Sequence, residues 1–409
     1  MNSDMEKKSE HPLMSEKFLH DFVGGFFEQR EFYLKVAQQY GSPLYLLESK
    51  VLEERAGQFK RAFQKELPRT SFYYAMKSNN LPDVSRILLG QGFGLDVSSG
   101  LELELALNLK AEDIIFSGPG KTYRELALAV ENSDRVTVLL DSFGECQRLM
   151  KILSQEGKSI EVGVRLNNNP TGLWRKFGVL PQELLAFYQE IKGHPQMQFR
   201  GLQFHSSWNL LPDGQVEIIQ TLGALLKKMP RDFLDSCEFI DIGGGYWPCQ
   251  GEWLVSGNPL EHYRVEAAPI EEFAKTLGKV IQEEILSLTQ CRICFEPGRW
   301  ICNDAMHILV KVIDKKAHDL VITDAGTNAV GWERFEMDYF PVLNLTRSSM
   351  TEKSCHILGS LCTPHDVWGY AYFGEDIREE DILMIPTQGA YTYSLRQEFI
   401  KPLPRVVIV

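Results

Sequence analysis

The chain has 409 residues, enough for two domains or for one large barrel with a further domain. Hydrophobic residues make up 44% and charged residues 24%, which is the balance of an ordinary globular protein with a sizeable core. The net charge of −12 argues against a nucleic-acid-binding surface and against attachment to an anionic membrane. No apolar run approaches the roughly 18 to 20 residues that span a bilayer, so we expect no membrane partner.

The N-terminal residues and the cysteines indicate a cytoplasmic protein. Residues Met1–Pro12 predict a flexible tail, because they are polar and lack the apolar core of a signal peptide. The eight cysteines show no disulfide-scaffold spacing, so we expect reduced thiols. Cys291 and Cys294 form a single C-x-x-C pair, which either serves zinc binding or redox chemistry or lies on a buried strand, Arg292–Phe295. Because no second pair exists, we favour the strand and predict no metal site.

Short apolar or β-branched runs alternate with helix-length segments from about residue 45 to residue 298. Eight runs predict strands: Ser71–Met76, Gly94–Val97, Ile114–Ser117, Val136–Asp141, Ile160–Leu166, Gly201–Phe204, Phe239–Ile242 and Ile293–Phe295. Apolar residues recur every three or four positions in the segments between them: Val51–Leu67, Leu101–Leu109, Phe143–Leu153, Gln215–Lys228 and Ile270–Leu288. Eight repeats of this alternation predict an α/β fold, a (β/α)8 TIM barrel over residues 45–298, although a doubly wound open sheet would show the same pattern.

The pattern changes after Arg299, where strand-like runs follow one another without long helices. These runs are Met306–Val312, Leu320–Thr323, Cys355–Leu358, Ile382–Pro386 and Arg405–Val409. They predict a C-terminal antiparallel β domain, a sandwich or barrel, over residues 299–409. We expect the segment 1–44 to supply the flexible tail and then to join this β domain.

Residue types that carry chemistry lie at the C-terminal ends of several of the eight predicted barrel strands. They are Lys77, Asp96, Arg165, His205, the run Gly243–Gly245, Glu296 and Arg299. Any one of them has a plainer interpretation, such as a solvated lysine, a glycine turn, a satisfied core histidine or a structural ion pair. In a barrel, however, the C-terminal strand ends meet at one mouth, so these residues would share a pocket. Glycines directly after a strand also let backbone N–H groups approach a phosphate.

The same residues, in this order, resemble the fold-type III pyridoxal-phosphate (PLP) decarboxylases, the ornithine/diaminopimelate/arginine decarboxylase family with its alanine-racemase-like barrel. The resemblance covers nearly the whole chain from about residue 30. It is carried by Tyr74-Ala75-Met76-Lys77-Ser78-Asn79, Leu95-Asp96-Val97-Ser98-Ser99-Gly100, Lys176-Phe177-Gly178, Gly243-Gly244-Gly245, Glu296-Pro297-Gly298-Arg299, Gly359-x-x-Cys362-x-x-x-Asp366 and Gly389-Ala390-Tyr391. Seven motifs in the family's order make the resemblance specific.

The resemblance implies a role for each polar residue at the barrel mouth. Lys77 would hold the cofactor as a Schiff base, and Glu296 would keep the pyridine nitrogen protonated, which makes the ring an electron sink. His205 would stack on the ring face. Asp96 and Arg165 would orient the lysine and the ring.

The resemblance also implies how the phosphate is held and where the proton donor comes from. The phosphate would contact Gly243, Gly244, Gly245, Ser207, Arg299 and Tyr391. Cys362 would return a proton to the α-carbon after CO2 leaves. In this family the cysteine strand comes from the other subunit, which implies a homodimer with shared active sites.

Three departures from the family pattern bear on phosphate and substrate. Trp208 stands where a phosphate-binding serine is expected, so either Ser207 compensates or the glycines hold the phosphate alone. Thr363 replaces the acidic residue that contacts a distal amine in many members. The segment 326–339 carries Arg334, which would meet a larger or carboxylate-bearing substrate, or simply face solvent or the dimer interface. We include Thr363, Asp366 and Arg334 as predicted substrate-binding residues.

The predicted function is PLP-dependent removal of an α-carboxylate as CO2 from an amino acid or an amino-acid conjugate. Basic amino acids, D-amino acids and conjugates from secondary-metabolite or siderophore pathways all stay open as substrates, and Thr363 and Trp208 favour conjugates. One alternative is an alanine-racemase-like amino-acid racemase, against which Glu296 and the Cys362 motif argue. A second alternative is a non-catalytic binding or regulatory homologue, against which Lys77, Glu296 and Cys362 together argue.

Overall fold

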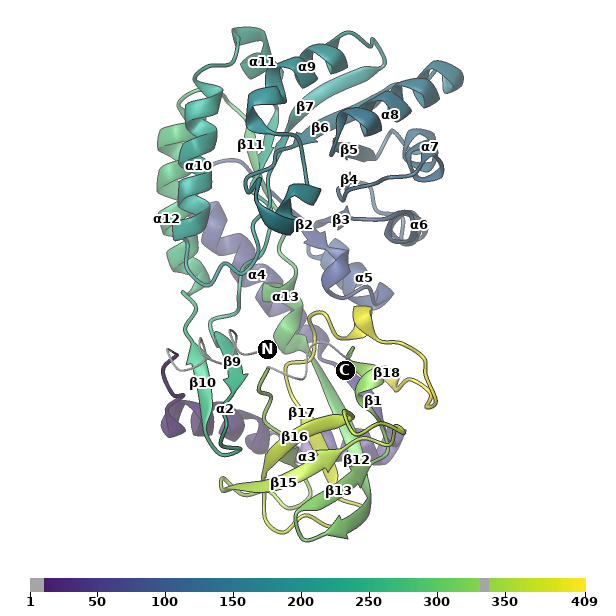
Figure 1. Ribbon diagram of the computed structural model, residues 1–409, viewed down its shortest axis with the longest axis vertical. Helices are drawn as coiled ribbons and strands as arrows, with labels where there is room; N and C mark the ends of the chain where they lie inside the picture. The colour runs from purple at the N-terminus through teal and green to yellow at the C-terminus, as the bar shows by residue number, and fades with distance from the viewer. Residues whose placement is uncertain (1–10, 332–337) are drawn as a thin grey trace. The chain divides into compact units, whose positions relative to one another are not determined.

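The computed structural model describes residues 11–331 and 338–409, and the chain divides into two compact units, each taken here by itself (Figure 1). Among the described residues, the barrel unit comprises 53–249 and 268–301, and the β unit comprises 11–52, 250–267, 302–331 and 338–409. Residues 250–267 lie within the predicted barrel range 45–298 but group with the β unit. The reason is pairing: Tyr263 bridges to Leu13, Leu254 bridges to Asp338, and His262 contacts Glu352.

Eight parallel strands form a closed barrel in the order β11-β2-β3-β4-β5-β6-β7-β8. Their bounds are β2 (Thr70–Ala75), β3 (Gly94–Val97), β4 (Ile114–Phe116), β5 (Val136–Leu140), β6 (Ile160–Arg165), β7 (Met197–Gln203), β8 (Phe239–Asp241) and β11 (Arg292–Phe295). Each corresponds to a predicted strand, and the pairing of β11 with both β8 and β2 closes the barrel. The TIM-barrel prediction is therefore confirmed over the open-sheet alternative.

Helices cover the outside of the barrel, and Figure 1 shows α6, α7 and α8 in a row along its outer side. Their bounds are α4 (Ser49–Glu66), α5 (Pro82–Gly90), α6 (Gly100–Asn108), α7 (Tyr123–Glu131), α8 (Phe143–Glu156), α9 (Leu184–Lys192), α10 (Asp213–Leu226), α11 (Arg231–Ser236), α12 (Ile270–Ile281) and α13 (Arg299–Cys302). Polar residues after the strands begin several of them: Ser99 and Ser142 cap α6 and α8, and Thr122 with Glu125 forms a capping box on α7.

The barrel interior is filled by large side chains placed opposite glycines. A core cluster joins Tyr73, Ile115, Leu139, Phe239 and Cys294 from five different strands. A Cβ added at the interior glycines would press into these side chains: Gly94 into the Tyr73 ring, Gly163 into Leu139, and Gly201 into the Phe239 ring. Because this layer is closely packed, the barrel is a solid support for polar residues at its mouth rather than a pore.

The β unit is built on one eight-stranded sheet in the order β13-β15-β16-β14-β17-β12-β1-β18, with a separate hairpin of two strands. The sheet strands are β1 (Leu44–Leu47), β12 (Met306–Ala317), β13 (Leu320–Thr323), β14 (Leu343–Asn344), β15 (Glu352–Leu358), β16 (Val367–Phe373), β17 (Ile382–Ile385) and β18 (Arg405–Ile408). The hairpin is β9 (Glu252–Val255) with β10 (His262–Val265). The predicted C-terminal β domain is confirmed, but the sheet is mixed, since β1–β18, β13–β15 and β14–β16 pair in parallel.

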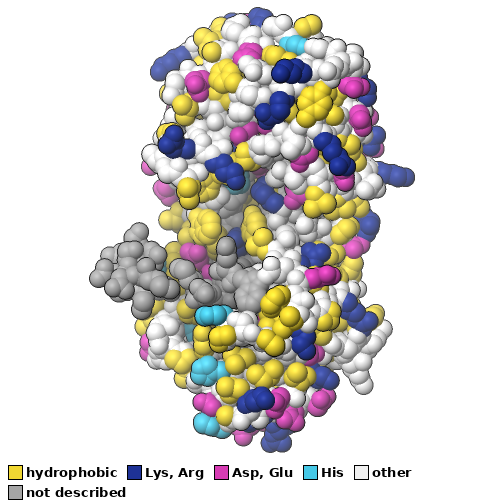
Figure 2. Space-filling view, turned by 45° about the vertical axis from the view of Figure 1, so that its right-hand side comes forward, with side chains coloured by type: hydrophobic (Ala, Val, Ile, Leu, Met, Phe, Trp, Pro, Cys, Tyr) yellow, Lys and Arg dark blue, Asp and Glu magenta, His cyan; other side chains and the backbone are white. Residues whose placement is uncertain are grey.

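Two N-terminal helices, α2 (Glu16–Glu28) and α3 (Arg30–Tyr40), pack on the β unit's own core. They bury Leu19, Val23 and Tyr33 against sheet residues such as Leu309 and Met384. No helix in the described ranges is long and apolar enough to cross a membrane. Basic and acidic side chains are interspersed over the face shown in Figure 2.

Candidate active site

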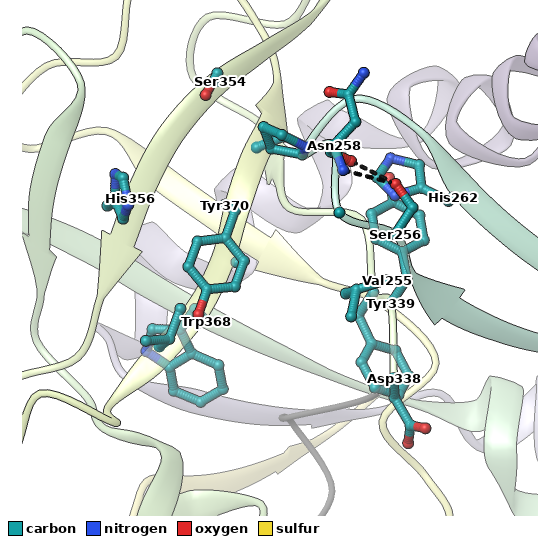
Figure 3. Close-up of a pocket in the computed structure, with 16 residues that line it drawn as sticks. Val255, Ser256, Asn258, His262, Asp338, Tyr339, Ser354, His356, Trp368 and Tyr370 are labelled. Carbon is teal, nitrogen blue, oxygen red and sulfur yellow. Dashed lines mark hydrogen bonds between the residues drawn. The ribbon is translucent and has the colours of Figure 1, made fainter. Parts of the chain in front are cut away.

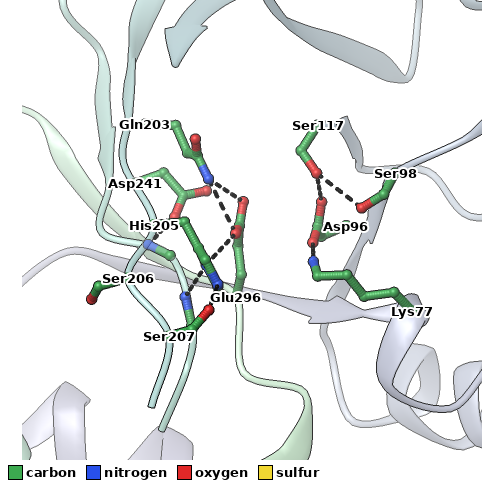
Figure 4. A network of polar contacts seen from close by, with 12 residues as sticks. Lys77, Asp96, Ser98, Ser117, Gln203, His205, Ser206, Ser207, Asp241 and Glu296 are labelled. Carbon is green, nitrogen blue, oxygen red and sulfur yellow. Dashed lines mark hydrogen bonds and ion pairs between the residues drawn. The ribbon is translucent and has the colours of Figure 1, made fainter. Parts of the chain in front are cut away.

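Lys77 lies directly after strand β2, in the single 3-10 turn Met76–Ser78 at the barrel mouth. Its Nζ donates to Asp96 Oδ2 at 2.7 Å, and the second oxygen of Asp96 accepts from the Ser117 hydroxyl (Figure 4). Ser98 lies 3.3 Å from Ser117 Oγ and extends this contact. The Asp96 side chain is fully buried, whereas 34% of the Lys77 side chain is exposed. A buried carboxylate thus orients an amine that a reagent can reach.

Glu296 follows strand β11 and is buried, with 1% of its side chain exposed. The Gln203 amide Nε2 lies 3.3 Å from both of its carboxylate oxygens (Figure 4). Burial, together with the charges of Asp241 and Asp96, raises the pKa of Glu296 well above its ordinary value. A cation or a protonated ring nitrogen beside this carboxylate would relieve that unfavourable burial.

His205 lies two residues after strand β7 and is held in one tautomer. The Gly244 N–H donates to its Nδ1 at 3.2 Å, so the ring proton resides on Nε2, which lies 3.3 Å from Ser207 Oγ. Burial, and then the positive charges of Lys77 and Arg165, hold the pKa of His205 well below its ordinary value. The 3.8 Å contact between Nδ1 and Glu296 Oε2 is therefore made by a neutral imidazole and is not an ion pair.

The three glycines after strand β8 form a tight loop against neighbouring backbone. Gly243 and Gly245 have φ of 71° and 82°, which glycine adopts without strain. A Cβ at Gly244 would overlap the Glu296 carbonyl oxygen, and one at Gly245 would overlap the Ser206 carbonyl oxygen. The N–H of Gly245 donates to no acceptor in the described part of the chain, which leaves it available to an anion.

Asn209 ties the loop after β7 to this glycine loop. Its Nδ2 donates to the Gly244 carbonyl at 3.0 Å, and its N–H donates to the Gly245 carbonyl at 3.0 Å. Its Oδ1 accepts from Ser206 Oγ at 3.1 Å. Two hydrogen bonds from Asn209, one from its side chain and one from its backbone N–H, therefore join the two loops predicted to surround a phosphate.

Aromatic and basic side chains flank these loops. Trp208 has a φ of 57° and is 61% exposed, and its ring centroid lies 5.9 Å from that of Trp247. The Arg299 guanidinium lies over the Trp247 ring, 4.2 Å from its centroid, and that of Arg165 lies 4.5 Å from the centroid of Phe177. Cation–π contact thus holds both arginines in place. Trp208 does not supply the hydroxyl that the family pattern leads one to expect.

The structure therefore brings together, in the barrel unit, the predicted site residues of that unit. They are Lys77, Asp96, Arg165, His205, Ser207, Gly243, Gly244, Gly245, Glu296 and Arg299. Cys362, Thr363, Asp366 and Tyr391 belong to the β unit. Arg334 lies outside the described residues.

Asp366 holds the loop that carries Cys362 between strands β15 and β16. One of its carboxylate oxygens accepts from the Thr327 N–H at 2.7 Å, and the other accepts from the Leu361 N–H at 2.7 Å. Only 2% of Asp366 is exposed, whereas Cys362 is exposed. This geometry suits Asp366 to shaping the loop and leaves its carboxylate facing away from solvent, which argues against the predicted substrate contact.

Tyr391 lies in a constrained loop of the β unit. Its φ is 57°, and that of Thr387 in the same loop is 54°, so two side-chain-bearing residues adopt a left-handed backbone here. The Thr387 N–H donates to His307 Nδ1 at 3.1 Å, which helps to hold this conformation. A Cβ at Gly389 would overlap the Cys302 carbonyl oxygen, so no larger residue fits at that position.

The β unit also contains a pocket of about 330 Å³ between the β9–β10 hairpin and the face of strands β15 and β16 (Figure 3). Its walls include Asn258, His262, Tyr339, His356 and Tyr370. None of the predicted site residues lines it. The candidate active site is therefore assigned from the chemistry of the barrel mouth, not from the size of this pocket.

Sequence reasoning missed Gln203, Asp241 and Asn209. Alternation along a strand was an available signal, since Gln203 shares a face with His205, and Asp241 shares one with Gly243. Cys294 lies on strand β11, as the preferred interpretation of the C-x-x-C pair predicted, and burial raises the pKa of Cys291 to about 12. No group of three or more potential metal ligands occurs among the residues that the structure describes.

Comparison with known proteins places these residues in context. The family model described as "Pyridoxal-dependent decarboxylase, pyridoxal binding domain" matches residues 53–303. A diaminopimelate decarboxylase of Methanothermobacter thermautotrophicus is 27% identical, over 92% of this chain and 88% of that protein. An L-glutamyl-[BtrI acyl-carrier protein] decarboxylase of Niallia circulans is 26% identical, over 88% of this chain and 86% of that protein. The crystal structure of diaminopimelate decarboxylase from M. jannaschii with L-lysine has a TM-score of 0.79 at 23% identity, over 92% of this chain and 89% of that chain.

Proposed function

Because this chain belongs to the pyridoxal-dependent decarboxylase family and is a PLP-dependent amino-acid decarboxylase, we propose that Lys77 and Glu296 are its two principal catalytic residues. When bound, PLP supplies a protonated pyridine ring that accepts the electron pair released as an α-carboxylate leaves as CO2. The protein supplies binding, orientation and placed charge. The observation that carries the proposal is that Lys77, Asp96 and Glu296 all lie at C-terminal strand ends of one closed barrel.

The residues at the barrel mouth fit PLP. Lys77 offers a primary amine on a partly exposed side chain for the aldehyde carbon, and Glu296 offers a buried carboxylate for the ring nitrogen. The N–H groups of Gly245 and Tyr246 donate to no acceptor within the described ranges, so both suit a phosphate oxygen. Arg299 adds positive charge to the same loops.

The remaining barrel residues have supporting roles in this proposal. Neutral His205 presents a flat imidazole to the ring, because its proton stays on Nε2 toward Ser207. Asp96 keeps Lys77 oriented, and the Arg165 charge contributes to the local field. Trp208 stands where the family pattern has a phosphate-binding serine, and Ser207 and the glycines make that phosphate contact instead.

The proton donor and the assembly belong to the same proposal. Cys362 Sγ would donate a proton to the substrate's α-carbon after CO2 leaves, on a loop that Asp366 shapes. Tyr391 would contact the phosphate. We propose a homodimer in which each cysteine loop completes the other subunit's site. A cytoplasmic location agrees with the eight cysteines, all of which are free thiols.

The proposed substrate is an α-amino acid whose far end carries no bare ammonium group to be recognised by an acid. Thr363 is uncharged at the position where many members place Asp or Glu, which weakens the case for ornithine or diaminopimelate. The glutamyl-carrier decarboxylase of Niallia circulans is a relative whose named substrate is a conjugate. A CO2-release screen of free diamino acids against acylated or carrier-linked amino acids decides between these classes.

The absorption spectrum tests the cofactor assignment. The wild-type protein reconstituted with PLP should show the visible band of a lysine-bound cofactor, and Lys77→Ala should lack it. Lys65→Ala, an exposed lysine on α4, is the matched control and should keep the band. A colourless wild-type protein would support a non-catalytic homologue, and loss of optical activity without CO2 would support a racemase.

A further inference from the structure

Asp241 is a buried acid at the candidate site to which no role has yet been given. It is the last residue of strand β8 and is 0% exposed. Its Oδ1 accepts from the Gly243 N–H at 2.8 Å, which ties it to the glycine loop. Its Oδ2 is buried and meets no hydrogen-bond donor in the described part of the chain. A buried carboxylate oxygen without a hydrogen-bond donor is unfavourable, so we expect a proton at or near Oδ2.

Figure 4 draws the carboxyl groups of Asp241 and Glu296 next to each other, and each acts on the pKa of the other. Two ionised carboxylates present only acceptor oxygens to each other, so such a contact needs one proton. Burial raises the pKa of Asp241 to about 7, and burial also raises the pKa of Glu296, to which the Asp241 charge contributes. The only other donor to Glu296 in the described ranges is Gln203 Nε2, at 3.3 Å from each oxygen.

The surrounding charges do not neutralise a doubly ionised pair. Lys77 lies near it but already donates to Asp96 at 2.7 Å. The titratable groups that face the pair from the neighbouring elements are Lys77, Asp96, Arg165, His205, Tyr246 and Cys294. Of these, only Lys77 and Arg165 are positive, because His205 is neutral. Two like charges at contact in a buried site are strongly disfavoured, and one bound proton removes one of them.

We propose that Asp241 and Glu296 share one proton, and that Asp241 is a positioning residue which keeps Glu296 singly charged and aligned for the ring nitrogen of PLP. The pair then carries one negative charge in total. The proton satisfies Asp241 Oδ2, while Oδ1 keeps its bond to the Gly243 N–H. This inference rests on the proposed function, because the group that Asp241 positions is the proposed partner of the cofactor ring.

Infrared spectroscopy of the full chain, stripped of cofactor, tests the shared proton directly. The C=O stretching band of a protonated carboxyl group is compared at neutral pH between wild type, Asp241→Asn and Glu296→Gln. Asparagine keeps an oxygen for the Gly243 N–H and gives an N–H2 group to Glu296, so it removes the titratable proton without removing the contacts. Each single variant should lose the same one band, and the double variant should lose no more than either.

The proposal would be overturned if the wild-type band persisted in Asp241→Asn. It would also be overturned if the two single variants lost different bands and the double variant lost both. A merely structural role for Asp241 would leave the band untouched in Asp241→Asn. The visible spectrum of the reconstituted variants is recorded in parallel. If Lys77 binds no cofactor while the shared band behaves as expected, the proposed function fails and the shared proton stands. If Lys77 binds cofactor and the band does not respond, only the proton-sharing pair is refuted.

Discussion

The barrel unit and the β unit carry their site residues on different kinds of backbone. In the barrel, Lys77, His205 and Glu296 lie within two residues of strand ends that are hydrogen-bonded on both sides. In the β unit, Cys362 lies on a loop whose shape depends on one buried carboxylate, Asp366. The residues proposed to bind the cofactor thus follow strands that are paired on both sides, whereas the residue proposed to donate the proton lies on a loop. Such a division suits a family in which one reaction is applied to different substrates.

The largest expected effect is in a mixture of two impaired variants, one altered in the barrel unit and the other altered in the β unit. Lys77→Ala and Cys362→Ala variants should each be impaired as homodimers. Mixing and re-associating them should restore roughly a quarter of wild-type CO2 release, because half of the dimers are mixed and each mixed dimer has one intact site. Activity that stays at the level of the separate variants after subunit exchange would contradict sites shared between subunits.

Within the barrel, Glu296→Gln should lower kcat by roughly a hundredfold, the size of effect expected when one preorganised electrostatic contact is lost. The glutamine keeps the shape of the side chain but cannot balance a protonated ring nitrogen. Steady-state CO2 release measures the effect, with Glu104→Gln on the exposed face of α6 as control. Wild-type turnover in Glu296→Gln would remove this residue from the mechanism.

Within the β unit, Asp366→Ala should cost about 1–3 kcal/mol of stability, because two buried backbone N–H groups lose their acceptor. Turnover should slow because the Cys362 loop is released, while the visible band of bound PLP stays. Thermal unfolding and the spectrum measure the two effects, and Asp376→Ala, at an exposed side chain, is the control. Loss of the cofactor band would show that Asp366 is also needed for PLP binding, which would contradict the assignment of cofactor binding to the barrel unit alone.

The smallest expected effect is a pH dependence of stability in the cofactor-free chain. The pKa of Asp241 is raised from 3.8 to about 7 in the folded state, so the folded chain holds a proton that the unfolded chain releases. Stability from this source is present below pH 3.8 and falls as the pH rises through 7. The melting temperature of Asp241→Asn should therefore fall less steeply between pH 3.8 and pH 7 than that of the wild type. An unchanged decline would place the titrating group elsewhere.

Much of the barrel could be predicted from sequence because its strands are short apolar runs that end in turn residues. Glu296-Pro297-Gly298 and Gly243-Gly244-Gly245 marked strand ends correctly. Strand β7 begins four residues before its predicted start, at Met197, because polar positions in the sequence Met-Gln-Phe-Arg alternate across a half-buried strand.

Other elements depend on packing that local sequence does not reveal. Helix α2 contains Gly24 and Gly25, which disfavour a helix, yet burial of Leu19 and Val23 stabilises it. The β9–β10 hairpin is held by contacts with Asp338 and Glu352, far along the chain. Alternation along β8 placed Asp241 on the face of Gly243, but its proposed partner, Glu296, follows a different strand, β11.

The most direct test of the account is to reduce the PLP-loaded protein with borohydride and to map the modified lysine by mass spectrometry. Reduction converts a lysine-bound cofactor into a stable phosphopyridoxyl group. We expect this group on the peptide that contains Lys77 and on no other. Attachment to a different lysine, or an unmodified Lys77 peptide in a fully loaded protein, would contradict it.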